Sequence, residues 1–362
     1  MESTRRSLRI AVLTVGPILL LVDVFMLHNS KKHRMVDPGL ISTEYREQIS
    51  KKNSLLTTDI HPIIILSTFR SGSSLTGDIL QQDKDSFYLY EPLNPLNYLM
   101  YQNITTLHLV NGSVQPIGIH DFNKVSANIL LSLITCDFTS LDVNTVSHGF
   151  LYYSNRSVPY ITCVDRNKRR TTLLSAIRKC LPILIEACEQ STHRIFKIVR
   201  LSMDWMERLL EKFPKLVVVH LIRDPRPIQV SRDNLGANIF KDLRKSFQEL
   251  CDLLSWNLFF ESKLNNTYNR IVRLYYEDLA LYPFRTSKWL YNILGLHYTS
   301  DVHAYVHHLT RAGIQNDCST CAIRANSSAH AYSWRGFFNA SQLNTIQDVC
   351  GNYMKAVGYI NS

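Results

Sequence analysis

An apolar run that ends in a turn rich in small polar residues constrains the fold of this chain more than any other feature. The run is His61–Ser67, HPIIILS, and it is typical of a strand buried on both faces. The next segment, Ser67–Thr76, contains Gly72 and several serines, and a helix is expected at Leu75–Gln82. A strand–turn–helix junction of this kind directs backbone N–H groups and a helix N-terminus to one point, so it predicts an anion site.

Two later segments, Ile195–Val199 and Leu216–Ile222, have the same buried-strand character. Between them, Ser202–Phe213 has helical spacing, with Ser202 as its N-cap and Pro214 after its end. A strand–helix–strand order predicts an α/β fold with a central parallel sheet and right-handed crossovers. Further along the chain we expect two helices with a strand between them: Phe247–Leu264, Pro283–Leu294 and Ile271–Tyr276.

The turn Ser67–Thr76 reads STFRSGSSLT, and its hydroxyls and the Arg70 guanidinium reinforce the predicted anion site. The pattern G-x-x-x-x-G-K-[ST] of a Walker A loop does not fit it. A serine-rich turn that caps an ordinary helix is the alternative. Because the turn follows a buried strand, phosphate binding is the favoured interpretation.

A second arginine- and serine-bearing turn, Leu221–Arg232, also follows a buried strand and reads LIRDPRPIQVSR. Pro225 and Pro227 suit a turn and the first turn of a helix. Arg223 and Ser231 would then lie near the carboxyl edge of the sheet, where open α/β folds bind ligands. A salt-bridged turn is the usual reading of Arg-Asp-Pro alone, but two such turns on inner strands favour a binding site.

The N-terminal region predicts membrane attachment. The apolar run Ile10–Leu27 is flanked by basic residues on both sides and is close to the minimum length for crossing a bilayer. A cleaved signal peptide is the alternative, but no convincing cleavage site follows the run. We therefore expect a cytosolic tail at 1–9, a signal-anchor at 10–27, a stem at 28–60 and a luminal domain at 61–362.

Sequons and cysteines support a luminal position for that domain. Six N-x-S/T triplets begin at Asn103, Asn111, Asn155, Asn265, Asn326 and Asn339. All eight cysteines follow the apolar run, and their even number suggests disulfides without fixing the pairing. Cys318 and Cys321 could form half of a zinc site, but nothing completes it, so a disulfide is favoured.

Charge narrows the ligand classes. The net charge of +10 suits an anionic ligand such as a nucleotide, an acidic polysaccharide or nucleic acid. The expected luminal position excludes nucleic acid. The exposed-looking cluster Lys168–Arg170 could attract an anionic glycan, although a solvated surface run fits it equally well.

Taken with Phe87–Pro92, FYLYEP, the two turns resemble the Golgi carbohydrate 6-O-sulfotransferases, which act on galactose, N-acetylgalactosamine or N-acetylglucosamine. The resemblance continues through Thr135–Phe138, Tyr276–Ala280 and a tail from Trp334 to Tyr359, so it covers roughly residues 61–362. It implies a P-loop-like sulfotransferase fold, a glycan acceptor and a Golgi membrane location. Phe69, where the family usually has Trp, and Gly336, where another Trp is common, depart from the pattern and bear on acceptor choice.

The same resemblance implies 3′-phosphoadenosine 5′-phosphosulfate as donor, with no metal. In that reading Arg70 and the first turn hold the 5′-phosphosulfate, while Arg223 and Ser231 hold the 3′-phosphate. The donor-binding residues expected are Thr68, Phe69, Arg70, Ser71, Gly72, Ser73, Ser74, Leu75, Thr76, Arg223, Asp224, Pro225, Arg226 and Ser231.

Sulfuryl transfer also needs a base for the acceptor hydroxyl and a cation beside the leaving oxygen. We expect Glu91 to be the base and Arg70 to stabilise the leaving oxygen. Glu91 could instead pair with an arginine, and His120 and His220 are rival bases. Glu277 and Asp278 are expected to be structural.

Two alternatives to an active sulfotransferase follow from the sequence. A glycan-binding pseudoenzyme that retains the nucleotide site is the main one, although Arg70 and Glu91 are both present. A small-molecule kinase would need a Walker lysine, which the turn lacks. The sequence leaves the acceptor sugar and the oligomeric state open, a homo-oligomer included.

Overall fold

A five-stranded parallel sheet forms the centre of the computed structural model, which describes residues 60–118, 120–311, 313 and 322–359. The strand order is β2-β5-β1-β6-β7. The central strand β1 therefore pairs with β5 on one side and with β6 on the other. The strands are β1 His61–Ser67, β2 Ser86–Tyr90, β5 His193–Ile198, β6 Val217–Ile222 and β7 Ile271–Tyr275.

Successive residues of β1 enter two different cores, as the two-residue period of a strand requires. Ile63 and Ile65 pack with helices on one face, while Ile64 and Leu66 pack with helices on the other, and all four are buried. The run is continuously apolar because both faces of the sheet are covered. The α/β prediction with a central parallel sheet is therefore confirmed.

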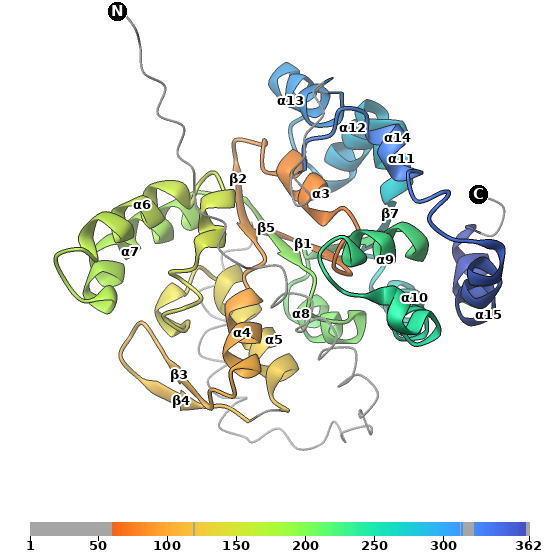
Figure 1. Cartoon of the computed structure of the whole chain (residues 1–362). Helices are drawn as coiled ribbons and strands as arrows, with labels where there is room; N and C mark the ends of the chain where they lie inside the picture. Colours follow the sequence, from red (N-terminus) through yellow and green to blue (C-terminus); the bar gives the residue numbers. More distant parts are fainter. Residues whose placement is uncertain (1–59, 119, 312, 314–321, 360–362) are drawn as a thin grey trace, which may run out of the picture.

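Helices cover both faces of the sheet (Figure 1). Helices α3, α11, α12, α13 and α14 pack on the face of Ile63 and Ile65, and α4, α5, α6, α7 and α8 pack on the opposite face. The first group spans Ser73–Leu80, Tyr276–Leu281, Pro283–Leu294, Ser300–Thr310 and Ser327–Ala331. The second spans Asn94–Tyr101, Phe122–Ile134, Val158–Asn167, Leu173–Glu189 and Glu207–Lys212.

A third core lies beyond β6 and β7, where α9, α10 and α15 pack together. These helices span Pro225–Asp233, Leu243–Tyr268 and Ala340–Val357. The other elements of the described residues are a small hairpin and four short 3₁₀ turns: β3 Thr106–His108, β4 Val114–Pro116, η1 Phe138–Ser140, η2 Gly149–Tyr153, η3 Met203–Met206 and η4 Ile239–Asp242.

The strands and the helix at 283–294 follow the sequence predictions to within two residues, but three helices differ in their starts or ends. Helix α10 spans Leu243–Tyr268, so it extends four residues beyond the predicted Phe247–Leu264 at each end. Helix α3 begins at Ser73 rather than Leu75, because Gly72 acts as its N-cap with a left-handed φ of 96°. The predicted helix Ser202–Phe213 is divided into η3 and α8. A serine N-cap and apolar spacing do not distinguish a 3₁₀ first turn from an α-helical one.

The predicted tail, signal-anchor and stem at 1–60 lie almost wholly outside the described residues, as does the Cys318–Cys321 pair. Within the described ranges, no helix combines the length and apolarity needed to cross a membrane. Nor do those ranges contain a cluster of histidine, cysteine and acidic side chains suited to a metal ion.

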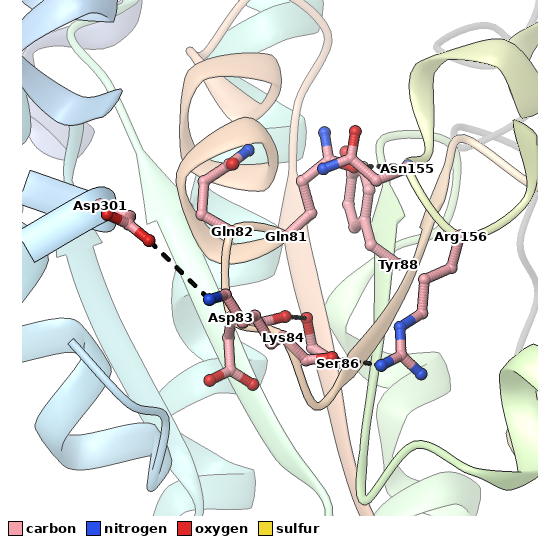
Figure 2. Close-up of a pocket in the computed structure, with 9 residues that line it drawn as sticks. All are labelled: Gln81, Gln82, Asp83, Lys84, Ser86, Tyr88, Asn155, Arg156 and Asp301. Atoms are coloured by element: carbon pink, nitrogen blue, oxygen red, sulfur yellow. Dashed lines mark hydrogen bonds and ion pairs between the residues drawn. The ribbon is translucent and has the colours of Figure 1, made fainter. Parts of the chain in front are cut away.

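A polar cavity of about 410 Å³ opens at the amino edge of β2 (Figure 2). Gln81, Tyr88 and Asn155 line it, together with Arg156, whose guanidinium donates to Lys84 O and to Ser191 Oγ. In a parallel sheet the amino edge is opposite the edge that carries the two predicted binding turns. This cavity is therefore separate from the predicted anion site.

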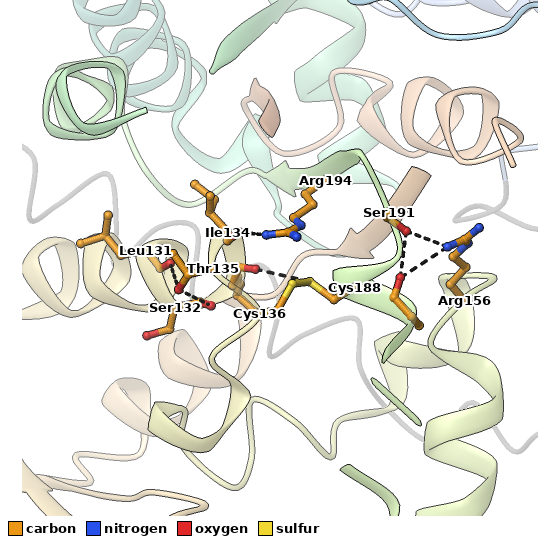
Figure 3. The surroundings of a disulfide bond; sticks show 11 residues. Leu131, Ser132, Ile134, Thr135, Cys136, Arg156, Cys188, Ser191 and Arg194 are labelled. Atoms are coloured by element: carbon orange, nitrogen blue, oxygen red, sulfur yellow. Dashed lines mark hydrogen bonds between the residues drawn. A yellow bond between two sulfur atoms is a disulfide. The ribbon is translucent and has the colours of Figure 1, made fainter. Parts of the chain in front are cut away.

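Three disulfides cross-link the described chain: Cys136–Cys188, Cys163–Cys180 and Cys251–Cys350. The first joins the segment after α5 to the end of α7, just before β5 begins (Figure 3). Beside it, Arg194 of β5 donates to Ile134 O at 2.6 Å. This cross-link therefore holds the start of β5 against the helices that precede it.

We expect the C251S/C350S variant to lose more stability than the C163S/C180S variant. The former pair closes a loop with a sequence separation of 99 residues and the latter one of 17. In the chain-entropy description, cross-links of these lengths contribute about 5 and about 3 kcal/mol. Urea unfolding of the non-reduced full chain would measure both losses. A larger loss in C163S/C180S would contradict the expectation.

Candidate active site

The first predicted turn has the backbone geometry of an anion cradle. Ser71 N donates to Thr68 O at 3.2 Å, and Arg70 in this turn has a left-handed φ of 73°. Gly72 then caps α3 without a side-chain hydrogen bond to the helix. The first amides of an α-helix have no partner within the helix, and at α3 no side chain of the cap accepts from them. These amides are therefore available to bind an anion.

Gly72 is required at this position for two independent reasons. Its φ of 96° is strained for any residue with a Cβ atom. A Cβ here would also lie 2.2 Å from Cδ2 of Tyr276, the first residue of α11. The close approach of Tyr276 to the turn therefore depends on glycine.

The second predicted turn meets the first at the carboxyl edge of β1 and β6. Arg70 Nε donates to Ser231 Oγ at 2.8 Å, and Arg223 Nη1 donates to Arg70 O at 3.0 Å. Arg232 adds a bond to Phe69 O at 3.2 Å. The Arg223 guanidinium lies 4.1 Å above the ring of Tyr276. The structure thus brings Arg70, Arg223 and Ser231 together, as the sequence predicted.

Positive charge is concentrated around these contacts. Burial first, and then the charges of Arg223 and Arg324, lower the pKa of Arg70 to about 10. Burial followed by Arg324, Arg223 and Arg70 lowers the pKa of His330 on α14 to about 4. Like charges raise one another's energy, so a bound anion would relieve the repulsion. The geometry and the charge both suit a phosphate or a sulfate.

Asp224, Pro225 and Arg226, although predicted among the donor residues, make contacts within the protein. The Asp224 carboxylate accepts from Arg226 Nη2 at 2.6 Å, and Arg226 also donates to Tyr359 O. The Arg226 guanidinium stacks on Trp334 at 4.0 Å. Pro225 begins α9. A direct donor contact by these three residues stays a prediction.

Glu91 follows β2 and lies in a buried ion cluster on the other side of β1. Its carboxylate accepts from Lys197 Nζ at 2.7 Å and also from Arg200 Nη1. Its φ of 45° is left-handed, as is that of Arg70. Such conformations cost about 1 kcal/mol or more in residues other than glycine and are frequent at functional sites.

The two cations decide the ionisation of Glu91. Burial alone would raise the pKa of its carboxyl, but Lys197 and Arg200 outweigh burial and lower the pKa to about 2. The carboxylate in turn raises the pKa of the Lys197 amine against the effect of burial. All three groups are therefore charged at neutral pH.

Lys197 connects this cluster to the first turn. Its Nζ donates to Ser74 Oγ at 3.0 Å and lies 3.5 Å above the ring of Tyr90. The Tyr90 hydroxyl also bonds Ser74 Oγ, at 3.0 Å. Glu91, Lys197 and the first turn of α3 consequently form one continuous polar site.

The other candidate residues from the sequence make contacts outside this polar site. His220 Nδ1 lies 2.5 Å from the Glu261 carboxylate in the buried core, and His120 is on an exposed loop. Glu277 accepts from Asp224 N at 3.2 Å and from the Tyr359 hydroxyl at 2.6 Å, as expected of a structural residue. Lys168 pairs with Asp165 on the exposed end of α6.

Comparison with known proteins identifies the family. Residues 62–300 match the model described as "Sulfotransferase family". This chain belongs to the sulfotransferase family.

Several relatives of this sulfotransferase carry carbohydrate sulfotransferase names. Carbohydrate sulfotransferase 1 of Rattus norvegicus is 26% identical, with 89% of this chain and 85% of that protein covered. Carbohydrate sulfotransferase 3 of Mus musculus is 24% identical, with 92% and 75% covered. Among solved structures, the sulfotransferase domain from the Synechococcus PCC 7002 olefin synthase has a TM-score of 0.45, at 16% identity, with 82% and 96% covered.

Sequence reasoning missed several residues of this sulfotransferase site. Lys197 was detectable, because it is the one charged residue in the apolar run Ile195–Val199 and a buried lysine requires a partner. Arg324, His330 and His148 had no comparable signal. His148 lies beside Phe150 and its Nδ1 is buried without a hydrogen-bond partner, and burial lowers its pKa to about 4.

Glu91 should make the free energy of unfolding of the protein fall as the pH is lowered through the acidic range. Its folded pKa of about 2 lies below the ordinary value of 4.5, so its contribution is complete above pH 4.5 and lost as the pH falls toward 2. The stability difference between the wild type and E91Q should therefore shrink by about 3 kcal/mol over that range. Denaturant unfolding at several pH values would measure it.

The variant D348N is the matched control, because Asp348 pairs with Arg244 in an exposed salt bridge. Such pairs contribute little to stability, so D348N should stay close to the wild type throughout. A wild type–E91Q difference that does not narrow on acidification would show that the ion cluster does not hold Glu91 ionised.

Proposed function

We propose that this sulfotransferase moves a sulfuryl group from 3′-phosphoadenosine 5′-phosphosulfate to a sugar hydroxyl. The observation that carries the proposal is the continuous site in which the Arg70 turn meets both the Arg223 turn and the Lys197–Glu91 pair. The names of the relatives support a carbohydrate acceptor. The resemblance of the sequence supports the 6-hydroxyl of galactose, N-acetylgalactosamine or N-acetylglucosamine as the position.

The residues present fit this donor at both of its phosphates. The uncapped start of α3 and the Arg70 guanidinium suit the 5′-phosphosulfate. Arg223 and Ser231 suit the 3′-phosphate, and Arg324 adds positive charge beside them. These groups neutralise the donor without a metal in the proposed mechanism. Crowding among the arginines favours a ligand with several negative charges, such as this donor with its 3′-phosphate and 5′-phosphosulfate.

The bound donor supplies the sulfuryl group, whose bond to the 5′-phosphate oxygen breaks as a bond to the acceptor oxygen forms. Negative charge grows on the phosphate oxygen that leaves with the electron pair. Arg70 is held at this point by Ser231, so its charge opposes that growth without reorganisation. Lys197, held on Ser74 Oγ, adds a second cation on the acceptor side.

In this proposal the acceptor proton passes to Glu91. A carboxylate with a pKa of about 2 is a weak base for an ordinary alcohol. In a loose transition state, however, the acceptor oxygen is only weakly bonded to sulfur, and the proton leaves late. The hydroxyl becomes strongly acidic as the bond to sulfur is completed, so a weak base then suffices. The partners of Glu91 also fix its position, which matters more than basicity in such a reaction.

The experiment is transfer of radiolabelled sulfate by the detergent-extracted full chain to desulfated chondroitin, keratan and N-acetylglucosamine-terminated oligosaccharides. We expect R70A to reduce kcat about 10²-fold or more and to weaken binding of 3′-phosphoadenosine 5′-phosphate. E91Q should retain nucleotide binding and lose about 10²- to 10⁴-fold in kcat. R285A is the matched control, since Arg285 is an arginine that stacks on the exposed ring of Tyr282.

The outcomes distinguish the alternatives. Nucleotide binding without transfer to any acceptor would favour a glycan-binding pseudoenzyme. Failure of the wild type to bind the nucleotide would reject the donor assignment. Equal losses in R285A and R70A would show that the effect is not local to the site.

We further propose a single-pass Golgi membrane protein with a luminal catalytic domain, based on the apolar run at 10–27, the sequons and the disulfides. Asn103, Asn111 and Asn155 are exposed, as glycan attachment requires. A C-terminal tag on the full chain should resist protease in intact microsomes. Treatment with an N-glycosidase should increase the electrophoretic mobility of the protein, because it removes attached glycans. Digestion of the tag without any mobility shift would contradict this location.

A further inference from the structure

Three aromatic rings extend outward from the catalytic side of the site. The ring centroids of Tyr90 and Phe150 are 5.1 Å apart, those of Tyr90 and Tyr153 are 5.2 Å apart, and those of Phe150 and Tyr153 are 5.9 Å apart. Tyr90 belongs to β2, whereas Phe150 and Tyr153 belong to η2. Tyr90 is the inner member, because it bonds Ser74 and carries Lys197 above its ring.

The η2 segment that carries the outer rings is fixed to its surroundings. The backbone N–H of Tyr90 donates to Ser154 Oγ at 3.1 Å, and Gln81 Nε2 donates to Tyr153 O at 3.2 Å. Ser157 Oγ donates to Leu151 O at 2.6 Å. These bonds join η2 to the edge of β2 and to α3, so the rings are held in place before any ligand binds.

The strand order separates these rings from the predicted donor contacts. Arg223 and Ser231 follow β6 on one side of β1, while β2 and η2 lie beyond β5 on the other side. The two sides meet at Ser74, where the first turn of α3 contacts both Lys197 and Tyr90. A ligand on the rings would therefore approach the reacting centre from the side opposite the nucleotide.

The chemistry of the outer rings selects the class of ligand. Tyr153 is 58% exposed, although it is packed against two other rings. The segment from Gly149 to Asn155 contains no charged residue. A sugar presents an apolar face of C–H groups, and such a face packs well on a fixed aromatic surface. An uncharged aromatic surface suits a neutral hexose or N-acetylhexosamine better than a uronic acid.

We propose that Phe150 and Tyr153, backed by Tyr90, form the platform on which the acceptor sugar stacks during transfer. This proposal rests on the proposed function. The platform places a neutral sugar over η2, with its reacting hydroxyl directed to Ser74, Lys197 and Glu91. It makes two residues of η2 determinants of acceptor affinity.

The test is steady-state kinetics of the full chain with Y153L, F150L and Y153F, using the glycan that the wild type sulfates best. Leucine keeps apolar bulk but removes the flat ring, so Y153L and F150L should each raise the acceptor KM about three- to tenfold. Y153F keeps the ring and should stay near the wild type. F259L is the matched control, since Phe259 is an aromatic residue on α10 with 64% exposure.

Binding of 3′-phosphoadenosine 5′-phosphate checks that each variant is folded and should change less than about twofold, because the rings lie away from the donor side. An unchanged acceptor KM in Y153L, with donor binding intact, would overturn the platform. So would an equal rise in F259L. A wild type that transfers no sulfate would instead reject the proposed function, and the platform with it.

Discussion

The buried ion cluster of Glu91, Lys197 and Arg200 is the interaction on which the rest of the site depends. Two cations and one carboxylate lie at the ends of β2 and β5, almost without solvent contact. An unpaired charge in such a place would cost several kcal/mol, so each member requires the others. The cluster orders the ends of both strands and holds the Lys197 amine on Ser74, at the start of α3.

The carboxyl edge of the sheet is consequently divided into two electrostatic regions. On the side of β2 and β5, Glu91 compensates much of the charge of Lys197 and Arg200. On the side of β1 and β6, burial and then the charges of neighbouring arginines lower the pKa of Arg70. The second region suits an anion with several negative charges, and the first suits a neutral hydroxyl-bearing ligand. The sulfuryl group would pass between them at the start of α3.

Local backbone strain is also found at this place. Arg70 and Glu91 both have left-handed backbone conformations, and Gly72 has a φ that only glycine adopts readily. Rigid supports surround them: the buried sheet, the bonds from Arg223 and Arg232 to the first turn, and the Cys136–Cys188 link before β5. These supports hold the strained residues in place, so the charged groups keep fixed orientations. Electrostatic stabilisation of a leaving oxygen needs such fixed charges.

The sequence by itself determined the parallel α/β core and the meeting of the two arginine- and serine-bearing turns. A continuous apolar run can be buried only in a sheet covered on both faces, and parallel strands bring the turns that follow them to one edge. Arg70, Arg223 and Ser231 were therefore predictable as neighbours. Glu91 was also predicted from the sequence, but only the tertiary structure showed that Lys197 pairs with it and that Phe150 and Tyr153 lie beside Tyr90, because these segments meet only through the strand order. No local pattern encodes that order, and it arises from the packing of the whole chain.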